Sequence, residues 1–438
     1  KSDRASGRLP DGRFGLRIAA RLCLRACLLI VASSALAAGS GGRNVARHLD
    51  KPYVILVSID GFGASFLTRY DTPVLDSIAA EGVRADALIP VYPTLTFPNH
   101  YSIATGLYPA RHRLIGNRFP SADRSGFYSL RDREAVGDGS WYGGLPAWVA
   151  AEQQGMVTAA YFFVGTEAEI SGVRPTYWNP FNPSVGGNVR VDQVLEWLAL
   201  PAERRPHFIT LYFEHVDRAT HDYGVGSAQS LGAIALVEGW LQRLRDGIAA
   251  LPVADQVYLL VVSDHGQAGY RPGATPFVID EVVNLDGVRA IDHGSVSFLY
   301  FDEPDPTRAN VICELINEVW RFGQAVVPGG APAAWKLRDD SLLPDVIAQA
   351  DPQYAVMASR RNPVGLSAGD HGWAPEFAEM HGIFLATGPR LPQALRIPAI
   401  DAVDVYPLMM TILELEADGP GDGDPGRLLP LLGPELQP

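Results

Sequence analysis

The sequence predicts an α/β fold with a mainly parallel central sheet and helices on both of its faces. Short apolar runs alternate along the chain with longer segments of helical periodicity. These runs are apolar at successive positions, which is typical of parallel strands buried on both faces. The composition agrees, because 47% of the 438 residues are hydrophobic and 19% are charged, enough to build a large core.

Four apolar runs are the predicted strands, and polar residues lie next to each of them. The runs are Tyr53–Ile59, Phe208–Phe213, Val257–Val262 and Ile383–Ala386. The first three lead to Asp60, Asp217 and Asp264, and the fourth follows His381. Because ligands of such sheets bind beyond the carboxyl ends of the strands, we expect a functional site at that edge.

Helices are predicted between these strands. The first spans residues 72–81, with Asp71 or Thr72 as its N-cap, Pro73 in its first turn and Gly82 at its end. Four more are predicted at 145–154, 227–250, 307–321 and 403–415. The long segment 266–370, which is rich in proline in places, is predicted to hold a small inserted subdomain.

The two ends of the chain are predicted to lie outside this domain. A basic segment, a short apolar stretch and a small-x-small site ending at Ala37 are typical of a secretory signal peptide, so a periplasmic or secreted protein is expected. The alternative, a stable membrane anchor, requires about 20 apolar residues, and the uninterrupted run is much shorter. The predicted parts are a signal peptide at 1–37, a linker at 38–51, the main domain at 52–416 and a tail of solvated Gly/Pro/Asp turns at 417–438.

Charge and cysteine content exclude several classes of function. Lys and Arg number 36 and Asp and Glu number 49, so the net charge is −13. This sign disfavours long nucleic acids as partners, because proteins bind them by neutralising phosphates. After the signal peptide, Cys313 is the one remaining cysteine, which excludes cysteine metal clusters and internal disulfides.

Four short motifs carry side chains that bind hard or borderline metals. They are Asp60-Gly61, Asp217-x3-His221, Asp264-His265-Gly266 and Asp370-His371-Gly372. Each motif alone has an ordinary interpretation as a turn, a cap or a surface charge pair. Together they predict two metal sites with three ligands each, and oxygen and imidazole ligands without thiolates suit zinc, or less well manganese. Two such metals suit in-line displacement at phosphorus.

A nucleophile is available at the start of another predicted helix. Pro98 fits the first turn of a helix that runs to Thr105 and ends at Gly106. Thr94 or Thr96 then stands near the helix N-terminus, where free N–H groups favour an alkoxide and an arriving phosphate. The alternative is an ordinary threonine N-cap.

Read together, these motifs resemble the nucleotide pyrophosphatase/phosphodiesterase family of the alkaline phosphatase superfamily. The resemblance rests on PTLTFPNHYSIATGLYPARH, VSIDG, FEHVDRATHDYG, SDHG and GDHGW…MHGIFLATGP, and it covers about Tyr53 to Leu415. It implies an alkaline phosphatase-like fold and, with the export signal, an exported bacterial member. It also implies that Thr96, directly before Phe-Pro-Asn, is the nucleophile and that Thr94 is structural.

The resemblance further implies two zinc ions and a substrate site. One zinc is implied at Asp217, His221 and His371, and the other at Asp60, Asp264, His265 and Thr96. Asn117 is implied to bind a phosphate oxygen, with Phe97, Tyr177 and Tyr212 around a nucleotide. The chain departs from the family pattern at Leu95, Phe163-Val164, His215 and Gln267. None of these departures removes an implied ligand, so they concern substrate preference.

The expected activity is hydrolysis of nucleotide phosphodiester or phosphoanhydride bonds through a covalent nucleotidyl-threonine, with ATP giving AMP and pyrophosphate. The apolar neighbours of Thr96, which are Leu95, Phe97 and Pro98, favour a diester over a monoester dianion. Two alternatives remain: a phosphodiesterase of the same superfamily that acts on lipid headgroups or phosphonates, and a zinc-binding protein without turnover. A sulfatase is disfavoured because Cys-x-Pro-x-Arg is absent.

Overall fold

The computed structural model describes residues 42–337, 342–361, 365–417 and 419–433. The predicted signal peptide lies outside the described residues. Residues 42–51, predicted as part of a linker, are docked on the domain: the Asn44 side chain donates to the carbonyls of Ala202 and Arg205 and accepts from Val157 N. Among the described residues, no helix is long and apolar enough to cross a membrane.

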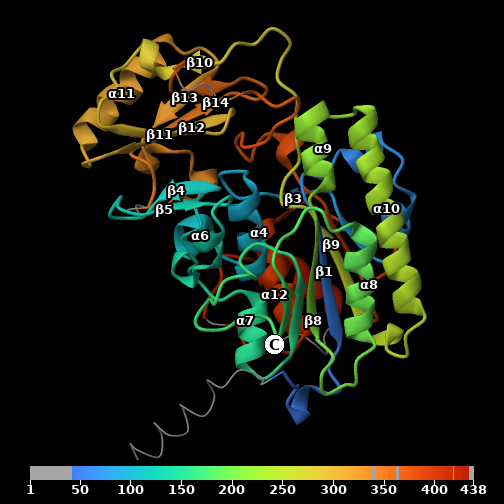
Figure 1. Ribbon diagram of the computed structural model, residues 1–438. Coiled ribbons are helices and arrows are strands. Elements are labelled where there is room, and N and C mark those ends of the chain that lie inside the picture. Colours follow the sequence, from blue (N-terminus) through green and yellow to red (C-terminus); the bar gives the residue numbers. More distant parts are fainter. Residues whose placement is uncertain (1–41, 338–341, 362–364, 418, 434–438) are drawn as a thin grey trace, which may run out of the picture.

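An eight-stranded sheet forms the centre of the protein (Figure 1). Its order is β17 (Leu395–Ile397), β2 (Val83–Ala85), β16 (Phe384–Thr387), β9 (Val257–Val262), β1 (Tyr53–Ile59), β8 (Phe208–Phe213), β6 (Thr158–Tyr161) and β7 (Tyr177–Asn179). All pairs are parallel except those of β16, which is antiparallel to β9 and β2. The predicted α/β class and mainly parallel sheet are confirmed. The prediction that the fourth strand is parallel was wrong, because an apolar run indicates burial on both faces but not direction.

Helices cover both faces of this sheet, as predicted (Figure 1). Alternate residues of β1 point into two different cores: Val54 and Leu56 pack with the helices of one face, and Ile55 and Val57 with those of the other. The first face carries α4 (Thr96–Thr105), α7 (Ala147–Gln153) and α12 (Val405–Ile412). The second carries α3 (Pro73–Glu81), α8 (Gly187–Leu198) and α10 (Ala228–Ala249). The helix α8 has no counterpart among the predicted helices.

A small subdomain is inserted between β9 and β16, as expected (Figure 1). Its antiparallel sheet has the order β11 (Val288–Asp292), β12 (Val296–Phe301), β14 (Val346–Ala350) and β13 (Gly323–Val326). The helix α11 (Pro306–Val319) packs on this sheet and shares a separate hydrophobic core with it. The hairpin of β4 (Arg118–Pro120) and β5 (Phe127–Ser129) belongs to the main domain.

Shorter elements complete the described structure. They are α2 (Phe66–Arg69), α5 (Pro109–His112), α6 (Arg133–Gly137), α9 (His215–Tyr223), α13 (Pro425–Leu428), β3 (Leu88–Ile89), β10 (Phe277–Val278), β15 (Val356–Met357) and β18 (Ile400–Asp401). The C-terminal segment is more ordered than the predicted solvated turns. Leu428, Leu429 and Leu432 are buried in the main core, and Arg427 pairs with Asp401 and Asp404. The apolar side chains after the Gly/Pro-rich stretch hold this segment against the domain.

His112 joins α5 to α4 and should make stability depend on pH. Leu114 N donates to His112 Nδ1 at 3.2 Å, so the neutral ring carries its proton on Nε2, which lies 2.9 Å from Ser102 Oγ. Burial lowers the pKa of His112 from 6.5 to about 3. Below about pH 6.5 the unfolded chain therefore binds a proton at this histidine and the folded protein does not. The free energy of unfolding then falls by about 1.4 kcal/mol for each pH unit by which the pH is lowered.

We expect the His112→Gln variant, which keeps a donor and an acceptor, to lose this part of the pH dependence. Urea unfolding at about pH 7.5 and at about pH 5.0 measures this pH dependence. The loss of unfolding free energy between the two pH values should be about 2 kcal/mol smaller in the variant than in the wild type. An unchanged difference would contradict the assignment of a neutral ring.

Candidate functional site

Most of the predicted metal ligands lie at the carboxyl ends of three adjacent strands. The strand β1 pairs with β8 on one side and β9 on the other, and the register aligns the three ends. The helix α9 begins two residues after β8. The side chains placed there are Asp60 after β1, Asp217 and His221 in α9, and Asp264 and His265 after β9.

A glycine allows α9 to approach β1 closely. Gly61 has φ of +70°, and a Cβ at this position would lie 2.9 Å from Asp217 Cα. Asp217 N also donates to Asp60 O at 3.1 Å. The Asp-Gly pair after β1 thus sets the distance between the two carboxylates, which explains why the residue after Asp60 has no side chain.

His371 reaches the site from the loop that returns from the subdomain. Asp370 and Ala268 exchange two backbone hydrogen bonds, which fix this loop on the segment after β9. The His371 Nδ1 lies 2.7 Å from Thr94 O, so it donates there and leaves Nε2 free to act as a ligand. Thr94 itself donates to Trp373 O and accepts from Gly372 N, which agrees with a structural role for this threonine.

One group of ligands surrounds the Thr96 hydroxyl. Thr96 Oγ1 lies 3.4 Å from His265 Nε2. The same Nε2 is 3.0 Å from Asp264 Oδ2 and 3.7 Å from Asp60 Oδ1. Asp60, Asp264 and His265 therefore converge beside Thr96, as the sequence led us to expect.

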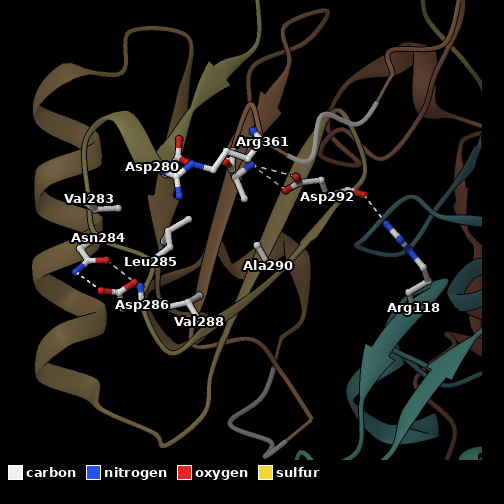
Figure 2. A pocket seen from close by; sticks show the side chains of 12 residues that line it. Arg118, Asp280, Val283, Asn284, Leu285, Asp286, Val288, Ala290, Asp292 and Arg361 are labelled. Carbon is white, nitrogen blue, oxygen red and sulfur yellow. Dashed lines mark hydrogen bonds between the residues drawn. The ribbon is translucent and has the colours of Figure 1, made fainter.

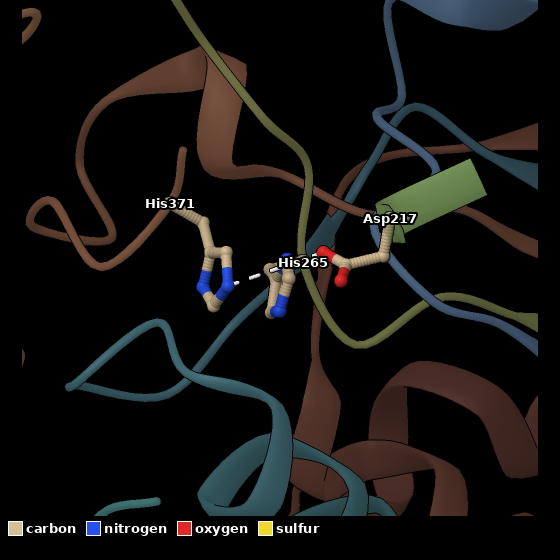
Figure 3. A group of neighbouring side chains, drawn as sticks. All are labelled: Asp217, His265 and His371. Carbon is tan, nitrogen blue, oxygen red and sulfur yellow. Dashed lines mark ion pairs between the residues drawn. The ribbon is translucent and has the colours of Figure 1, made fainter. Parts of the chain in front are cut away.

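The second group lies next to the first. Asp217 Oδ1 is 3.4 Å from His221 Nε2 and 3.9 Å from His371 Nε2. The rings of His371 and His265 stack with their centroids 3.8 Å apart, which joins the two groups. Figure 3 shows His371, His265 and Asp217 pointing toward one another from three separate segments.

The donor atoms fit divalent cations. Asp60 Oδ1 is buried with no hydrogen-bond partner among the described residues, and the Asp264 carboxylate lies close to it, so this pair of buried acids is costly unless a cation binds them. Burial, reinforced by Asp264 and Asp217, raises the pKa of Asp60 well above its usual value. Burial lowers the pKa of His371 well below its usual value, and a neutral imidazole is the form that binds metal.

Thr96 is placed as a nucleophile would be. The helix α4 begins at Thr96 and ends at Thr105, with Pro98 in its first turn as predicted, and Leu95 is the N-cap. In the described structure no side chain caps this end, so the Thr96 hydroxyl is not an ordinary N-cap. It stands half-buried at the positive end of the helix dipole, where an anion is favoured.

Three neighbours of the predicted ligands were not in the predicted ligand sets, although Asp370 was part of a metal-binding motif and Gln267 was noted as a departure from the family pattern. His100, one turn after Thr96, has its Nδ1 3.2 Å from Asp264 Oδ2 and its Nε2 2.8 Å from Ser58 Oγ. Gln267 donates to Asp217 Oδ1. Asp370 Oδ1 lies 3.8 Å from His221 Nδ1, and its Oδ2 accepts from a tyrosine. They contact the predicted ligands, and Asp370 and His100 themselves belong to groups of side chains that could hold a metal ion. Their helical or adjacent spacing to the motifs was the available signal.

An aromatic pocket opens beside Thr96. It has a volume of about 160 Å³ and is lined by Thr96, Phe97, Phe163, Phe181 and Tyr212, among others. The Tyr212 hydroxyl donates to Asp60 Oδ2 at 2.5 Å. Asn117 Oδ1 accepts from Phe97 N at 2.9 Å, so this amide lies at the N-terminus of α4. The structure thus brings Phe97, Tyr212 and Asn117 close to Thr96.

Tyr177 is not part of this pocket, and its assignment as a base-stacking residue is corrected. It begins β7, opposite Ala159 near the start of β6, and therefore lies toward the other edge of the sheet. Its ring stacks on Trp197 and its hydroxyl donates to Arg204 O. Phe181, two residues beyond the carboxyl end of β7, lines the pocket instead. Applying the strand-end rule to residues 177–179 would have indicated Phe181.

Comparison with known proteins identifies the family of this chain. The profile of the type I phosphodiesterase/nucleotide pyrophosphatase family matches residues 54–382. The chain belongs to this family. The predicted resemblance is thereby confirmed, and the family is one of phosphodiester hydrolases.

Relatives of this phosphodiesterase family member include animal proteins of greater length. It is 30% identical over 394 residues to human ectonucleotide pyrophosphatase/phosphodiesterase family member 1, covering 87% of this chain and 42% of that protein. It is 30% identical over 404 residues to venom phosphodiesterase 2 of Crotalus adamanteus, covering 90% and 49%. The chain thus spans less than half the length of these curated relatives.

Solved structures support the alkaline phosphatase-like fold. Murine ectonucleotide pyrophosphatase/phosphodiesterase 5 aligns with a TM-score of 0.80 and 26% identity, covering 86% of this chain and 99% of that one. An inactive threonine-to-alanine variant of the murine protein, in complex with AMP, aligns equally well at 25% identity, covering 87% and 100%.

Proposed function

We propose that the protein hydrolyses nucleotide phosphodiester or phosphoanhydride bonds, for example ATP to AMP and pyrophosphate. The observation that carries this proposal is the Thr96 hydroxyl at the start of α4, 3.4 Å from His265 Nε2 and open to an aromatic pocket. The complex of a murine relative with AMP supports a nucleotide as the ligand.

The two carboxylate–imidazole groups fit two zinc ions. Asp217, His221 and His371 would hold one, and Asp60, Asp264 and His265 the other, with Thr96 completing the second set. When bound, such ions supply Lewis-acid stabilisation of the charged transition state and lower the pKa of a bound hydroxyl. The unpartnered buried oxygen of Asp60, with the Asp264 carboxylate close to it, supports this assignment.

Each residue around the site has its own role in the proposed reaction. Thr96 Oγ1 forms a bond to phosphorus while the bond from phosphorus to the leaving oxygen breaks, which gives a nucleotidyl-threonine. The N-terminus of α4 and the Asn117 amide stabilise the negative phosphoryl oxygens. Phe97 and Phe181 hold the base, and Tyr212 keeps Asp60 in place through its hydrogen bond. Water then attacks the same phosphorus and frees Thr96 and the nucleotide.

The alternative substrates are lipid-headgroup or phosphonate diesters, and the alternative class is a zinc-binding protein without turnover. Turnover of ATP and of the p-nitrophenyl ester of TMP, compared with a choline phosphodiester, separates these possibilities. We expect the two nucleotide substrates to be preferred. Preference for the choline ester would overturn the nucleotide assignment, and hydrolysis of none of them would favour the non-catalytic alternative.

We infer that the protein acts outside the cytoplasm, in the periplasm or as a secreted protein. Support comes from the signal-like sequence at 1–37 and from the single cysteine that follows it. Expression of the full chain, followed by sequencing of the N-terminus of the exported product, tests this inference, because cleavage is expected after Ala37.

Replacing Phe181 by alanine should weaken nucleotide binding. Stacking of a base on an aromatic ring contributes about 1–3 kcal/mol, so KM should rise roughly tenfold or more while kcat changes less. Tyr177→Phe is the control, because Tyr177 lies away from the pocket and should leave KM unchanged. The reverse result would restore Tyr177 as the stacking residue.

A further inference from the structure

A second cleft lies beside the predicted metal ligands and adjoins the aromatic pocket, with which it shares Leu130. It has a volume of about 540 Å³, and its lining includes Asn117, Arg118, Arg131, His221, His293 and His371. We call it the arginine cleft. Since Asn117 and two of the predicted metal ligands line it, whatever occupies this cleft lies next to the reacting phosphorus.

Two arginines line this cleft, and the carboxylate of Asp292 only partly offsets the charge of Arg118. Neither Arg118 nor Arg131 forms an ion pair with any residue that the structure describes. Arg118 donates to the backbone carbonyl of Asp292 at 2.8 Å, a contact that orients the guanidinium without neutralising it (Figure 2). Burial and the nearby positive charge of Arg131 lower the pKa of Arg118. Two cations held close together favour a bound anion.

The carboxylates in the lining are already satisfied. Asp292 accepts hydrogen bonds from Ala358 N and Ser297 Oγ. Figure 2 shows its side chain turned toward the subdomain pocket on the other side of Arg118. Asp370 accepts from Tyr270 and from the backbone of His371. Neither carboxylate is therefore free to occupy the place of an anion beside the arginines.

The inserted subdomain adds one more polar group. His293, in the turn between β11 and β12, lines the cleft, and its Nε2 is buried with no hydrogen-bond partner in the described part of the chain. A neutral imidazole N–H is a suitable donor to a phosphate oxygen. Because it comes from the subdomain, the cleft is completed only when the two sheets pack together.

We propose that the arginine cleft binds a phosphate-bearing leaving group, such as the pyrophosphate of a nucleoside triphosphate. The proposal rests on the function proposed above, in which the base occupies the aromatic pocket. The transferred phosphoryl group then lies at Thr96 between the two cavities, and the leaving group extends toward Arg118, Arg131 and His293. The protein thus selects substrates whose leaving group is anionic.

Two substrates with the same transferred group test this proposal. TTP leaves pyrophosphate, whereas the p-nitrophenyl ester of TMP carries an uncharged substituent. Charge-assisted hydrogen bonds predict that Arg131→Ala lowers kcat/KM for TTP roughly tenfold to a hundredfold more than for the nitrophenyl ester. Inhibition of nitrophenyl ester hydrolysis by inorganic pyrophosphate should weaken by a similar factor. Arg131→Lys should recover part of both effects.

The control is Arg321→Ala, which removes an exposed arginine of the subdomain that lines none of these cavities. It should change neither the substrate ratio nor pyrophosphate inhibition. Equal losses of Arg131→Ala on both substrates, or undiminished pyrophosphate inhibition, would overturn the proposal. If the wild type hydrolyses neither substrate, the proposed function fails. The cleft can then still be tested by calorimetry, because pyrophosphate should bind the wild type more tightly than Arg131→Ala.

Discussion

Replacing Thr96 by alanine should abolish hydrolysis of ATP and of nitrophenyl TMP while leaving the protein folded. Loss of a nucleophile removes the covalent step, and the fall in kcat should be on the order of 10⁴-fold or more. The fold should tolerate the change because Thr96 is half-buried and the described structure gives its hydroxyl no capping role. Steady-state kinetics and thermal unfolding of the same preparation measure both effects.

Thr96→Ser is the matched variant, because it keeps the hydroxyl and removes one methyl group. It should retain activity within roughly a factor of ten of the wild type. Thr94→Ala provides the contrast: Thr94 hydrogen-bonds Trp373 and Gly372, so this change should lower stability rather than remove the nucleophile. Retention of substantial activity by Thr96→Ala would refute the covalent mechanism.

Removing divalent ions should abolish activity and also lower the melting temperature. Asp60 has a buried oxygen without a hydrogen-bond partner among the described residues and lies close to Asp264, so the apo protein keeps an unfavourable pair of carboxylates that bound cations relieve. At an ion concentration of about 1,000 times Kd, each site stabilises the fold by about 4 kcal/mol. Chelation should therefore lower Tm by several degrees, and added zinc should restore both Tm and activity.

Metal analysis of single variants tests whether there are two separate sites. The wild type should bind two ions, whereas Asp60→Ala and Asp217→Ala should each retain one. Asp404→Asn changes another buried carboxylate, one that contacts Arg427 and the backbone away from the site, and should keep both ions. Two ions in every variant, or none in the wild type, would contradict the assigned ligands.

The residues that we propose as metal ligands and nucleophile could be proposed from the sequence because most of them belong to local patterns. Asp60, Asp264 and His265 follow buried strands, and Asp217 and His221 share one face of a helical turn. These patterns depend on a few neighbouring residues, so the sequence alone indicates them. The choice of Thr96 over Thr94 came from the family resemblance, and the structure places Thr96 at the site with Thr94 beneath it.

The predictions that the structure corrects concern features set by contacts between distant parts of the chain. An apolar run fits either strand direction, which is why the antiparallel course of β16 was missed. Tyr177 and Phe181 lie four positions apart, and the position at which β7 joins the sheet decides which of them lines the pocket beside Thr96. The C-terminal leucines are buried because they pack in the same core as α12, from which the Gly/Pro-rich stretch separates them in the sequence.

The sequence by itself determined the α/β class, the chemistry of the ligands and the identity of the family. The tertiary structure alone decided which groups meet. His100 lies against Asp264, and Phe181 rather than Tyr177 lines the aromatic pocket. His293 of the subdomain lines the same cleft as Arg118 of the main domain. The physical reason is that ligand type is a property of single residues, whereas a cavity is formed by segments whose contact depends on strand pairing and packing of the whole chain.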